Sequence, residues 1–353
     1  MAEAKKVRIG FVGVGGMGQA AHLRNYVMTP ECEVVAIAEM KQDQARNVAA
    51  RWGIKKVYAS HEDMLAKEKL DGIVASQPFT RHGTLVPELL KAGIPVFTEK
   101  PIAGSVEMGA KIVKAVAAAN TWMMIGYHKR SDPATMLAKA EIDRLKQTRE
   151  LGKLNYIRIL MPAGDWIANG FNQNVGGNDP SPNLTWDAPA SDMDPETNDA
   201  YTSFVNYYIH QVNYMRHLLG ETWSVNYAAK SGLLLAGESA SGVTCSIEMS
   251  PYCTTIDWQE HAMVCFERGW VKVELPAPLA FTRPGRVEIF RDPGKGVQPK
   301  TEIPQLPWVH AMWQQAQNFV AAIQGKHPPL CTAADALEDI KLAREYIRIW
   351  KGK

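Results

Sequence analysis

The sequence predicts an α/β protein of two domains: a doubly wound parallel sheet in the N-terminal domain, then an α+β domain built on a large, open, mainly antiparallel sheet. The first observation is length, because 353 residues exceed the roughly 250 to 300 residues at which single cores stop growing. The second is that short apolar runs alternate with helical periodicity up to about residue 128, which is typical of successive βαβ units. The third is that later runs alternate in polarity and follow one another directly.

The first predicted domain, residues 1–128, contains five strands separated by four helices. Its strands are continuously apolar, as in Ile73-Val74-Ala75, which a sheet covered on both faces requires. The predicted strands are 7–12, 33–38, 72–76, 95–98 and 122–126. The helical patterns lie near 17–28, 42–52, 81–92 and 105–119.

The second predicted domain, residues 129–353, begins with a helix and a strand and then loses regular periodicity. A segment rich in Asn, Asp, Pro and Gly runs from 162 to about 202, and a helix after it ends at Leu218-Leu219-Gly220. We predict helix 133–149, strands 154–161, 223–229, 242–249, 261–266, 270–275 and 286–290, and closing helices 310–324 and 333–350. The last helix is a candidate to pack back on the first domain.

Composition and charge exclude several classes of protein. A formal net charge of +2, with no block of Lys and Arg interleaved with aromatics, is not the pattern of a nucleic-acid or anionic-membrane binder. No apolar run reaches the roughly 18 residues of a membrane-spanning helix, and the first residues do not form a signal peptide. Five widely spaced cysteines predict free thiols in the cytoplasm rather than a metal or disulfide framework. We therefore expect a cytoplasmic protein with a small-molecule partner and no metal.

A glycine-rich turn, Gly13-Val14-Gly15-Gly16-Met17-Gly18, follows the first predicted strand and opens the first predicted helix. Gly13, Gly15 and Gly18 fit the pattern G-x-G-x-x-G. The first glycine permits a tight turn, the second lets the backbone approach a pyrophosphate, and the third allows close packing of helix against strand. The turn predicts a Rossmann domain that binds a dinucleotide at the helix N-terminus.

Glu39 stands at the end of the second predicted strand, about 20 residues after the glycine turn, and Met40 follows it. An acid at this place accepts hydrogen bonds from the adenosine ribose and repels a 2′-phosphate. We therefore expect NAD rather than NADP, although the neighbouring Lys41 weakens that preference because a cation there would attract the phosphate.

Thr98-Glu99-Lys100-Pro101 follows another strand of the predicted parallel sheet. Ligands of open α/β sheets bind outside the carboxyl ends of the strands, so Lys100 is well placed for chemistry. Pro101 restricts the residue before it to an extended conformation, which fixes the direction of Lys100.

A polar but uncharged stripe is predicted on the helix that ends at Gly220. Asn206, His210, Asn213 and His217 recur at helical spacing and therefore share one helix face. A solvent-facing stripe would normally carry Lys and Glu, whereas amides and imidazoles suit a lined cavity or a buried hydrogen-bonded seam.

With these motifs the chain resembles the glucose-fructose oxidoreductase, inositol dehydrogenase and rhizopine-catabolism (Gfo/Idh/MocA) family along nearly its whole length. The resemblance implies Lys100 and His210 beside the nicotinamide and oligomer contacts through the open sheet. It rests on the glycine turn, Ser76-Gln77-Pro78 with His82, Glu99-Lys100-Pro101, Gly126-Tyr127-His128-Lys129-Arg130, and Tyr208-Ile209-His210 with Leu218-Leu219-Gly220.

The chain departs from the family pattern at two positions, because Asn206 and Asn213 stand where the family usually has aspartates. Without those anions, Lys100 and His210 are expected to titrate at lower pH than in the family pattern. A neutral imidazole is what a general base needs, so dehydrogenation stays possible.

The long polar segment offers carboxylates, amides and flat aromatic rings, which suit a polyhydroxylated ligand. We interpret it as a ligand or interface segment, because compact domains rarely carry so long an irregular stretch. A calcium site from Asp192, Asp194, Glu196 and Asp199 matches no known loop spacing. The segment supplies Asp165, Trp166, Asn169, Phe171, Asn172, Gln173, Asn174, Asn178, Trp186, Asp192 and Asp194.

The leading hypothesis is an NAD-dependent enzyme that oxidises, or reversibly reduces, a secondary hydroxyl of a sugar, glycoside or cyclitol, assembled as a homodimer or homotetramer. The candidate catalytic residues are Lys100, His210 and Asn206. The candidate cofactor residues are Gly13, Val14, Gly15, Gly16, Met17, Gly18, Glu39, Met40, Ser76, Gln77, Pro78, His82, Glu99 and Lys100. The candidate substrate residues are Tyr127, His128, Arg130, Asp165, Trp166, Asn206 and Asn213. A redox-neutral NAD-dependent glycosidase acting through a transient keto-sugar and a non-catalytic sugar or dinucleotide sensor stay open as alternatives.

Overall fold

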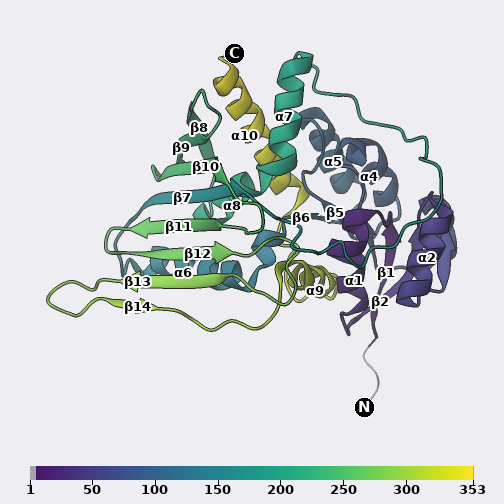
Figure 1. Cartoon of the computed structure of the whole chain (residues 1–353), viewed down its shortest axis with the longest axis horizontal. Coiled ribbons are helices and arrows are strands. Elements are labelled where there is room, and N and C mark those ends of the chain that lie inside the picture. Colours follow the sequence, from purple (N-terminus) through teal and green to yellow (C-terminus); the bar gives the residue numbers. More distant parts are fainter. Residues whose placement is uncertain (1–4, 353) are drawn as a thin grey trace. The chain divides into compact units, whose positions relative to one another are not determined.

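The structure is a computed structural model that describes residues 5–352 and contains two sheets (Figure 1). Its contacts divide the chain into two compact units. The Rossmann unit comprises the chain up to Tyr127 together with residues 169–198 and 312–340. The sheet unit comprises residues 128–168, 199–311 and the chain from Lys341 onward. Residues 169–198 and 312–340, which follow the sequence boundary at 128, thus group with the Rossmann unit.

The Rossmann unit is built on a six-stranded sheet in the order β3-β2-β1-β4-β5-β6, with every neighbouring pair parallel. Strand β1 lies between β2 and β4, so the strand order reverses beside it, and dinucleotides bind at such a reversal. The strands are β1 Val7–Val12, β2 Cys32–Ala38, β3 Lys56–Tyr58, β4 Gly72–Ala75, β5 Val96–Glu99 and β6 Met123–Gly126.

Helices connect these strands, and serine side chains cap the starts of two of them. Ser60 accepts a hydrogen bond from the Asp63 amide at the start of α3, and Ser105 does the same for the Met108 amide at the start of α5. The helices are α1 Arg24–Val27, α2 Gln42–Trp52, α3 His61–Lys67, α4 His82–Leu90 and α5 Val106–Ala118. The chain from Gly18 to Leu23 is π-helical, where the sequence predicted the start of an ordinary helix.

The core of the Rossmann unit is aromatic, and a distant segment completes it. Phe11, Tyr26 and Phe97 are buried, and Phe319 contacts Tyr26 and Phe97 edge to face at centroid distances of 6.3 and 5.6 Å. Phe319 belongs to α9 (Ala311–Ile323), so this helix supplies apolar surface to a sheet made some 200 residues earlier.

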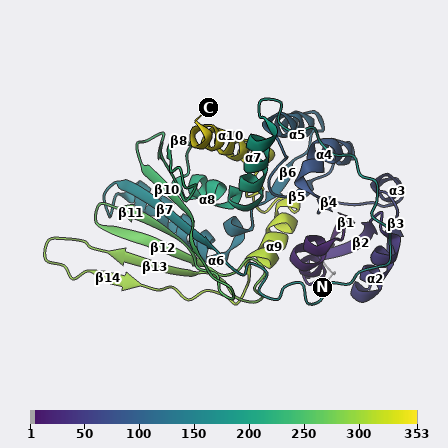
Figure 2. The same ribbon diagram turned by 45° about the horizontal axis from the view of Figure 1, so that its top comes forward.

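The sheet unit contains eight strands in the order β14-β13-β12-β11-β7-β10-β9-β8 (Figure 2). All neighbours are antiparallel except β7 and β10, which run parallel. The two sheets confirm the predicted fold class. The strands are β7 Leu154–Ala163, β8 Trp223–Ala228, β9 Leu234–Ser239, β10 Thr244–Cys253, β11 Glu260–Phe266, β12 Gly269–Leu275, β13 Arg286–Arg291 and β14 Lys300–Glu302.

Two helices, α6 (Pro133–Thr148) and α8 (Ile209–Leu219), contact this sheet, α6 on β12 and β13 and α8 on β7 and β10. Strand β11 shows why, because its buried residues alternate with half-buried ones, so one face is covered. Helices α7 (Pro195–Tyr207) and α10 (Ala333–Lys351) each begin in one unit and end in the other. None of the helices within residues 5–352 is both long and apolar enough to cross a membrane.

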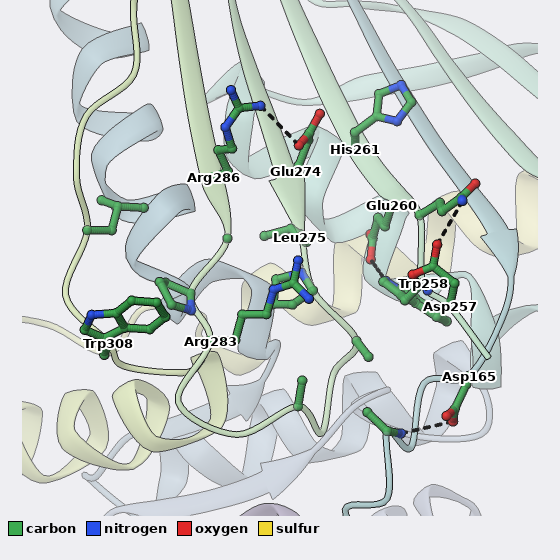
Figure 3. Close-up of a pocket in the computed structure, with 18 of the residues that line it drawn as sticks. Asp165, Asp257, Trp258, Glu260, His261, Glu274, Leu275, Arg283, Arg286 and Trp308 are labelled. Carbon is green, nitrogen blue, oxygen red and sulfur yellow. Dashed lines mark hydrogen bonds and ion pairs between the residues drawn. The ribbon is translucent and has the colours of Figure 1, made fainter.

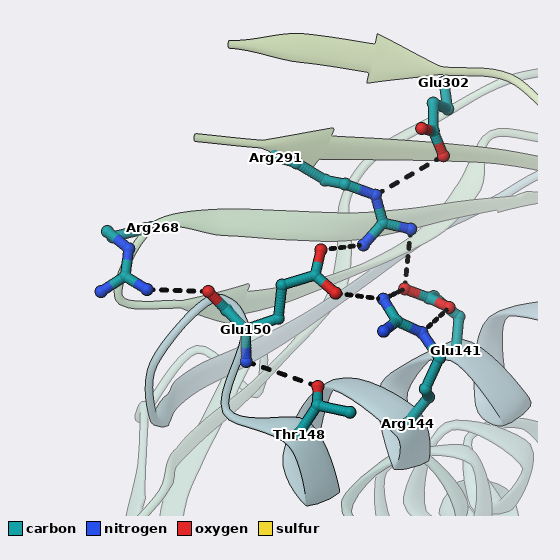
Figure 4. A network of polar contacts seen from close by, with 7 residues as sticks. All are labelled: Glu141, Arg144, Thr148, Glu150, Arg268, Arg291 and Glu302. Atoms are coloured by element: carbon teal, nitrogen blue, oxygen red, sulfur yellow. Dashed lines mark hydrogen bonds and ion pairs between the residues drawn. The ribbon is translucent and has the colours of Figure 1, made fainter. Parts of the chain in front are cut away.

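Ion pairs connect α6 with strands β13 and β14 of the sheet (Figure 4). Arg291 of β13 lies 2.7 Å from Glu141 of α6 and 3.1 Å from Glu150, and Arg144 of α6 joins both carboxylates. Arg291 also reaches Glu302 of β14 at 3.5 Å. A network of this kind fixes geometry better than isolated surface pairs do.

Candidate active site

The glycine turn adopts the geometry that its residues require. Gly13 has φ +91°, and a Cβ there would lie 2.1 Å from the Gln77 side chain and 2.6 Å from the Ser76 carbonyl oxygen. A Cβ on Gly18 would lie 2.9 Å from the Gly13 carbonyl oxygen. Both positions therefore exclude any side chain.

The middle of the turn is open and fits a pyrophosphate. Around the position that a Cβ would take on Gly15, no described residue beyond its own chain neighbours comes within 4 Å. The backbone bends here from β1 into the helical stretch that begins beside Gly16, where main-chain amides and the helix dipole favour an anion. Closed packing around Gly13 and Gly18 with open space at Gly15 is the arrangement that a dinucleotide needs.

Glu39 lies directly beside this turn. Its carboxylate accepts a hydrogen bond from the Val14 amide and another from the Lys41 amide, each at 3.0 Å. The side chain is therefore held at the end of β2, with oxygen lone pairs left for ribose hydroxyls. Met40, the next residue, is half exposed.

The predicted cofactor residues after β4 form a braced loop. The Ser76 amide donates to Val12 of β1, and Arg81 donates to the Gln77 side chain at 2.8 Å. His82 is fully buried, with one ring nitrogen 3.1 Å from the Gln77 carbonyl oxygen and the other 3.1 Å from the Ile102 carbonyl oxygen. Burial lowers the pKa of His82 in spite of these hydrogen bonds. His82 therefore ties the loop after β4 to the loop after β5.

Lys100 follows β5, and its neighbour Glu99 is anchored by a residue that the sequence did not single out. The Glu99 carboxylate lies 2.7 Å from the imidazole of His22, which is buried in the π-helical stretch after the glycine turn. Burial opposes the ionisation of Glu99, but the His22 hydrogen bond and the charge of Lys100 outweigh it and lower the pKa of Glu99. A lone His near a glycine turn carries no spacing signal, which is why sequence reasoning missed it.

Residues 173–187, which we call the strap, lie along the Rossmann unit beside α2 and α4 (Figure 1). Near the glycine turn, Asn174 donates to the Gly16 carbonyl oxygen, and Val175 exchanges two hydrogen bonds with the side chain of Gln19. Asp179 bonds the first turn of α2, and Asp187 accepts from the Gly83 amide and the Thr84 hydroxyl at the start of α4. Because α2 follows β2 and α4 follows β4, the strap spans the sheet edge on which the glycine turn lies.

The four residues of the predicted polar stripe around His210 lie on two consecutive helices instead of one. Asn206 is exposed and lies on α7, which ends at Tyr207, whereas His210, Asn213 and His217 lie on α8. His210 contacts the ring of His128 edge to face, with the centroids 4.7 Å apart. The structure thus brings two of the predicted site residues together within the sheet unit.

Asn213 is buried and accepts a hydrogen bond of 2.8 Å from Nε of Arg130. An amide oxygen satisfies the guanidinium here without adding a charge to the interior. In this chain the residue that replaces the family's aspartate therefore orients Arg130.

A buried ion pair beside these residues was missed by sequence reasoning. Lys129 lies 2.5 Å from Glu260, and their side chains are 4% and 0% exposed. Gln211 donates to one oxygen of Glu260 at 2.7 Å, and the indole of Trp258 donates to the other at 3.2 Å. A pair so fully hydrogen-bonded is compatible with burial. Its partners lie some 130 residues apart, and no spacing rule connects them.

A cavity of about 910 Å³ opens in the sheet unit beside this ion pair (Figure 3). Asp165 is the one predicted substrate residue that lines it, and Oδ1 of Asp165 also accepts hydrogen bonds from the Ile167 and Ala168 amides. Carboxylates and indole rings share the wall, which suits a polyhydroxylated ligand. The lining residues labelled in Figure 3 are Asp165, Asp257, Trp258, Glu260, His261, Glu274, Leu275, Arg283, Arg286 and Trp308.

Trp166 lies in the same loop as Asp165, with its carbonyl oxygen bonded to the Leu279 amide. Tyr127 is buried at the end of the Rossmann unit. Over residues 5–352, His, Cys, Asp and Glu side chains form no group of three or more that could hold a metal ion.

A parallel sheet with a glycine cradle, a carboxylate at the end of β2 and a lysine after β5 defines an NAD-binding oxidoreductase. Residues 7–127 match the model of the family described as "Oxidoreductase family, NAD-binding Rossmann fold". Over these residues the match bears out the resemblance to the glucose-fructose oxidoreductase, inositol dehydrogenase and rhizopine-catabolism (Gfo/Idh/MocA) family seen in the motifs, and it bears out NAD as the cofactor.

Curated relatives and a solved structure extend the comparison. The chain is 24% identical to the rhizopine catabolism protein MocA of Rhizobium meliloti, over 96% of this chain and 93% of that protein. It is 31% identical to inositol 2-dehydrogenase of Rubrobacter xylanophilus, but this match spans only 40% of each chain. A crystal structure of a putative myo-inositol dehydrogenase from Sinorhizobium meliloti shares the fold, with a TM-score of 0.70, 21% identity and 98% coverage of both chains.

Proposed function

We propose that this NAD-binding oxidoreductase oxidises, or in the reverse direction reduces, a secondary hydroxyl of a sugar, glycoside or cyclitol. The observation that carries the proposal is Lys100 at the carboxyl end of β5, beside a Glu99 that is held by His22. Strands β1, β4 and β5 are parallel neighbours about 4.8 Å apart, so Lys100 follows a strand on the same sheet edge as the glycine turn. The names of the relatives support an inositol-like substrate class.

The proposed roles follow from the chemistry of each side chain. Bound NAD supplies a nicotinamide ring that accepts a hydride from the carbinol carbon. His210 takes the hydroxyl proton as a general base, and Lys100 stabilises the developing alkoxide. Asn206 orients one of these groups, and Arg130, Asp165 and Trp166 contact the substrate or the nicotinamide. We propose the cytoplasm as the location of this activity.

Replacement of Lys100 tests the assignment. We expect Lys100→Ala to lower turnover by about 100-fold or more, because preorganised charge at the reacting oxygen is lost, while NADH affinity changes little. Lys114→Ala, at an exposed position on α5, is the matched control. Turnover would be measured on a panel of sugars, glycosides and cyclitols by NADH absorbance and product mass. Unchanged turnover of Lys100→Ala with its substrate would overturn the role of Lys100.

The strap favours a second candidate function, a redox-neutral glycosidase that forms a transient keto-sugar and then returns the hydride. A segment bonded to α2 and α4 across the cofactor edge would slow NAD exchange, which such a cycle tolerates because the cofactor is regenerated in place. The same panel separates the two functions. Glycoside cleavage without net NADH supports the glycosidase, and net NADH supports the dehydrogenase.

A further inference from the structure

The first turn of α2 carries a carboxylate that comes from the strap, 135 residues away in the sequence. The two oxygens of Asp179 accept hydrogen bonds from the amides of Asp43 and Gln44, each at 2.9 Å. Lys41, the residue before α2, has only donor groups in its side chain and cannot cap these amides. Asp179 therefore takes the place of the missing N-cap acceptor.

The strap packs tightly against the start of α2. A Cβ on Gly177 would lie 2.3 Å from the Gln44 nitrogen and 2.7 Å from Oδ2 of Asp179, so only glycine lets the strap approach the helix. Asn47 of α2 donates to the Gly176 carbonyl oxygen at 2.8 Å. The amides of Asp43 and Gln44 hold the pKa of Asp179 below its usual range, although partial desolvation opposes them, so the carboxylate is charged at neutral pH.

Asp179 belongs to the same hydrogen-bonded surface as the predicted adenosine site. Gln44 donates through its backbone to Asp179 and through its side chain to the Val14 carbonyl oxygen at 2.7 Å. Val14 in turn donates to Glu39, and the second oxygen of Glu39 binds the Lys41 amide. The glycine turn, Glu39 and the Asp179-capped helix start thus form one connected wall.

A 2′-phosphate on the adenosine ribose would contact this wall. An acid at the position of Glu39 binds the ribose hydroxyls, so a 2′-phosphate would project toward the loop between β2 and α2. The free amides of a helix start would normally attract that phosphate. Here the amides of Asp43 and Gln44 already bind an anion, so the phosphate would find them occupied and would meet the carboxylates of Glu39 and Asp179. Of the cations besides Lys41, Arg46 is paired with Asp43 and Arg81 donates to Gln77.

We propose that Asp179 is a specificity-determining residue that excludes the 2′-phosphate of NADP, and that the strap thereby forms part of the dinucleotide site. Asp179 takes the amides that the phosphate would use and adds a like charge beside it. The inference rests on the proposed function only in requiring that NAD binds at the glycine turn. This exclusion would make the site select NAD over NADP even though the charge of Lys41 attracts the phosphate and weakens the repulsion from Glu39.

Binding titrations of NADH and NADPH test this inference without a substrate. The variants are Asp179→Asn, which keeps the side-chain volume and one acceptor, and Asp179→Ala, with each cofactor followed by its fluorescence. We expect the NADPH/NADH ratio of dissociation constants to fall by about 10-fold or more in both variants, which corresponds to about 1.4 kcal/mol. NADH affinity should change by less than about threefold, because the unphosphorylated ribose does not need the freed amides.

Asp187→Asn is the matched control, because Asp187 makes an equivalent contact from the same strap but at the start of α4. It should leave the NADPH/NADH ratio unchanged. A ratio within about twofold of wild type in folded Asp179→Asn that still binds NADH overturns the inference. If wild type binds neither cofactor, the proposed function fails instead. Should Asp179→Ala unfold, Asp179→Asn decides the matter alone.

Discussion

At the scale of single residues, His22 shows how the candidate chemistry is supported. It is 2% exposed, packs edge to face against Phe97 at 5.2 Å, and holds the Glu99 carboxylate immediately before Lys100. Since His22 lies in the stretch that follows the glycine turn, one side chain links the cofactor cradle to the β5 loop. We infer that His22 is a positioning residue rather than a catalytic one.

Replacing His22 should therefore alter both stability and pH dependence. We expect His22→Ala to lower the free energy of unfolding by about 2 kcal/mol or more, because the largely buried carboxylate of Glu99 loses the hydrogen bond from His22 and keeps only that from the Lys100 amide. Burial then dominates and the pKa of Glu99 rises, so the acid limb of kcat/KM should move to higher pH. Denaturant titration and a pH–rate profile measure the two effects. An acid limb at its wild-type pH would contradict the positioning role.

The candidate site was predictable from sequence only where residues follow one another along the chain. The glycine turn, Glu39 and Lys100 were accessible because each follows a strand of a parallel sheet, where position in the sequence fixes position on the edge. His22–Glu99, Lys129–Glu260 and the contact of Asp179 with α2 join residues 77 to 136 positions apart. Such pairs leave no periodicity in one sequence.

At the scale of elements, α6 shows how burial at a helix start makes stability depend on pH. Asp132 accepts hydrogen bonds from the Ala134 amide at the start of α6 and from the Gly285 amide. Burial nevertheless raises the pKa of Asp132 from 3.8 to about 6. The folded chain therefore binds a proton that the unfolded chain releases across this range.

The sign of the effect follows from that difference. Stabilisation by protonated Asp132 is fully present below about pH 4 and is lost as the pH rises through about 6, a total of about 3 kcal/mol. Asp132→Asn cannot titrate, so the stability of wild type relative to this variant should fall from about pH 4 to pH 7. Urea titrations of both proteins at several pH values measure this difference. A difference that is constant or rises with pH would contradict the assignment.

Most of the elements that sequence reasoning missed are short. Strands β3 and β14 have three residues each and α3 has seven, which is too few for a hydrophobic period to develop. Strand β9 has six residues and was missed as well. The π-helical stretch after Gly18 and the first residues of α7, inside the predicted irregular segment, were also missed. The long helices α2, α6 and α10 begin where their sequences predicted, because apolar spacing marks all three and the capping residues Asp132 and Thr332 precede α6 and α10.

At the scale of the whole molecule, the outer face of the eight-stranded sheet carries apolar side chains in a continuous row. Cys265 of β11 pairs in register with Tyr156 of β7 and with Trp270 of β12, and Trp270 stacks on Phe290 of β13 at 5.8 Å. All four are half-buried and lie opposite the strictly buried residues of their strands. We propose that this row is the contact through which the chain assembles with copies of itself.

A charge placed in that row should dissociate the assembly. We expect Trp270→Glu and Phe290→Glu to shift the protein to a smaller species in sedimentation velocity, because burying a carboxylate without a partner is costly. Met28→Glu, at a half-exposed position of the Rossmann unit, should leave the mass unchanged. An unaltered mass in both sheet variants would place the interface elsewhere.

The most direct measurement follows the hydrogen that the proposed reaction moves. A cyclitol or sugar that the panel identifies as substrate would be deuterated at its carbinol carbons and incubated with the protein and NAD, and the nucleotide analysed by mass spectrometry. The proposed function predicts deuterium in the nicotinamide ring with wild type and its loss with Lys100→Ala. Conversion of the substrate with no deuterium reaching the nicotinamide, under single-turnover conditions with wild type, would contradict it.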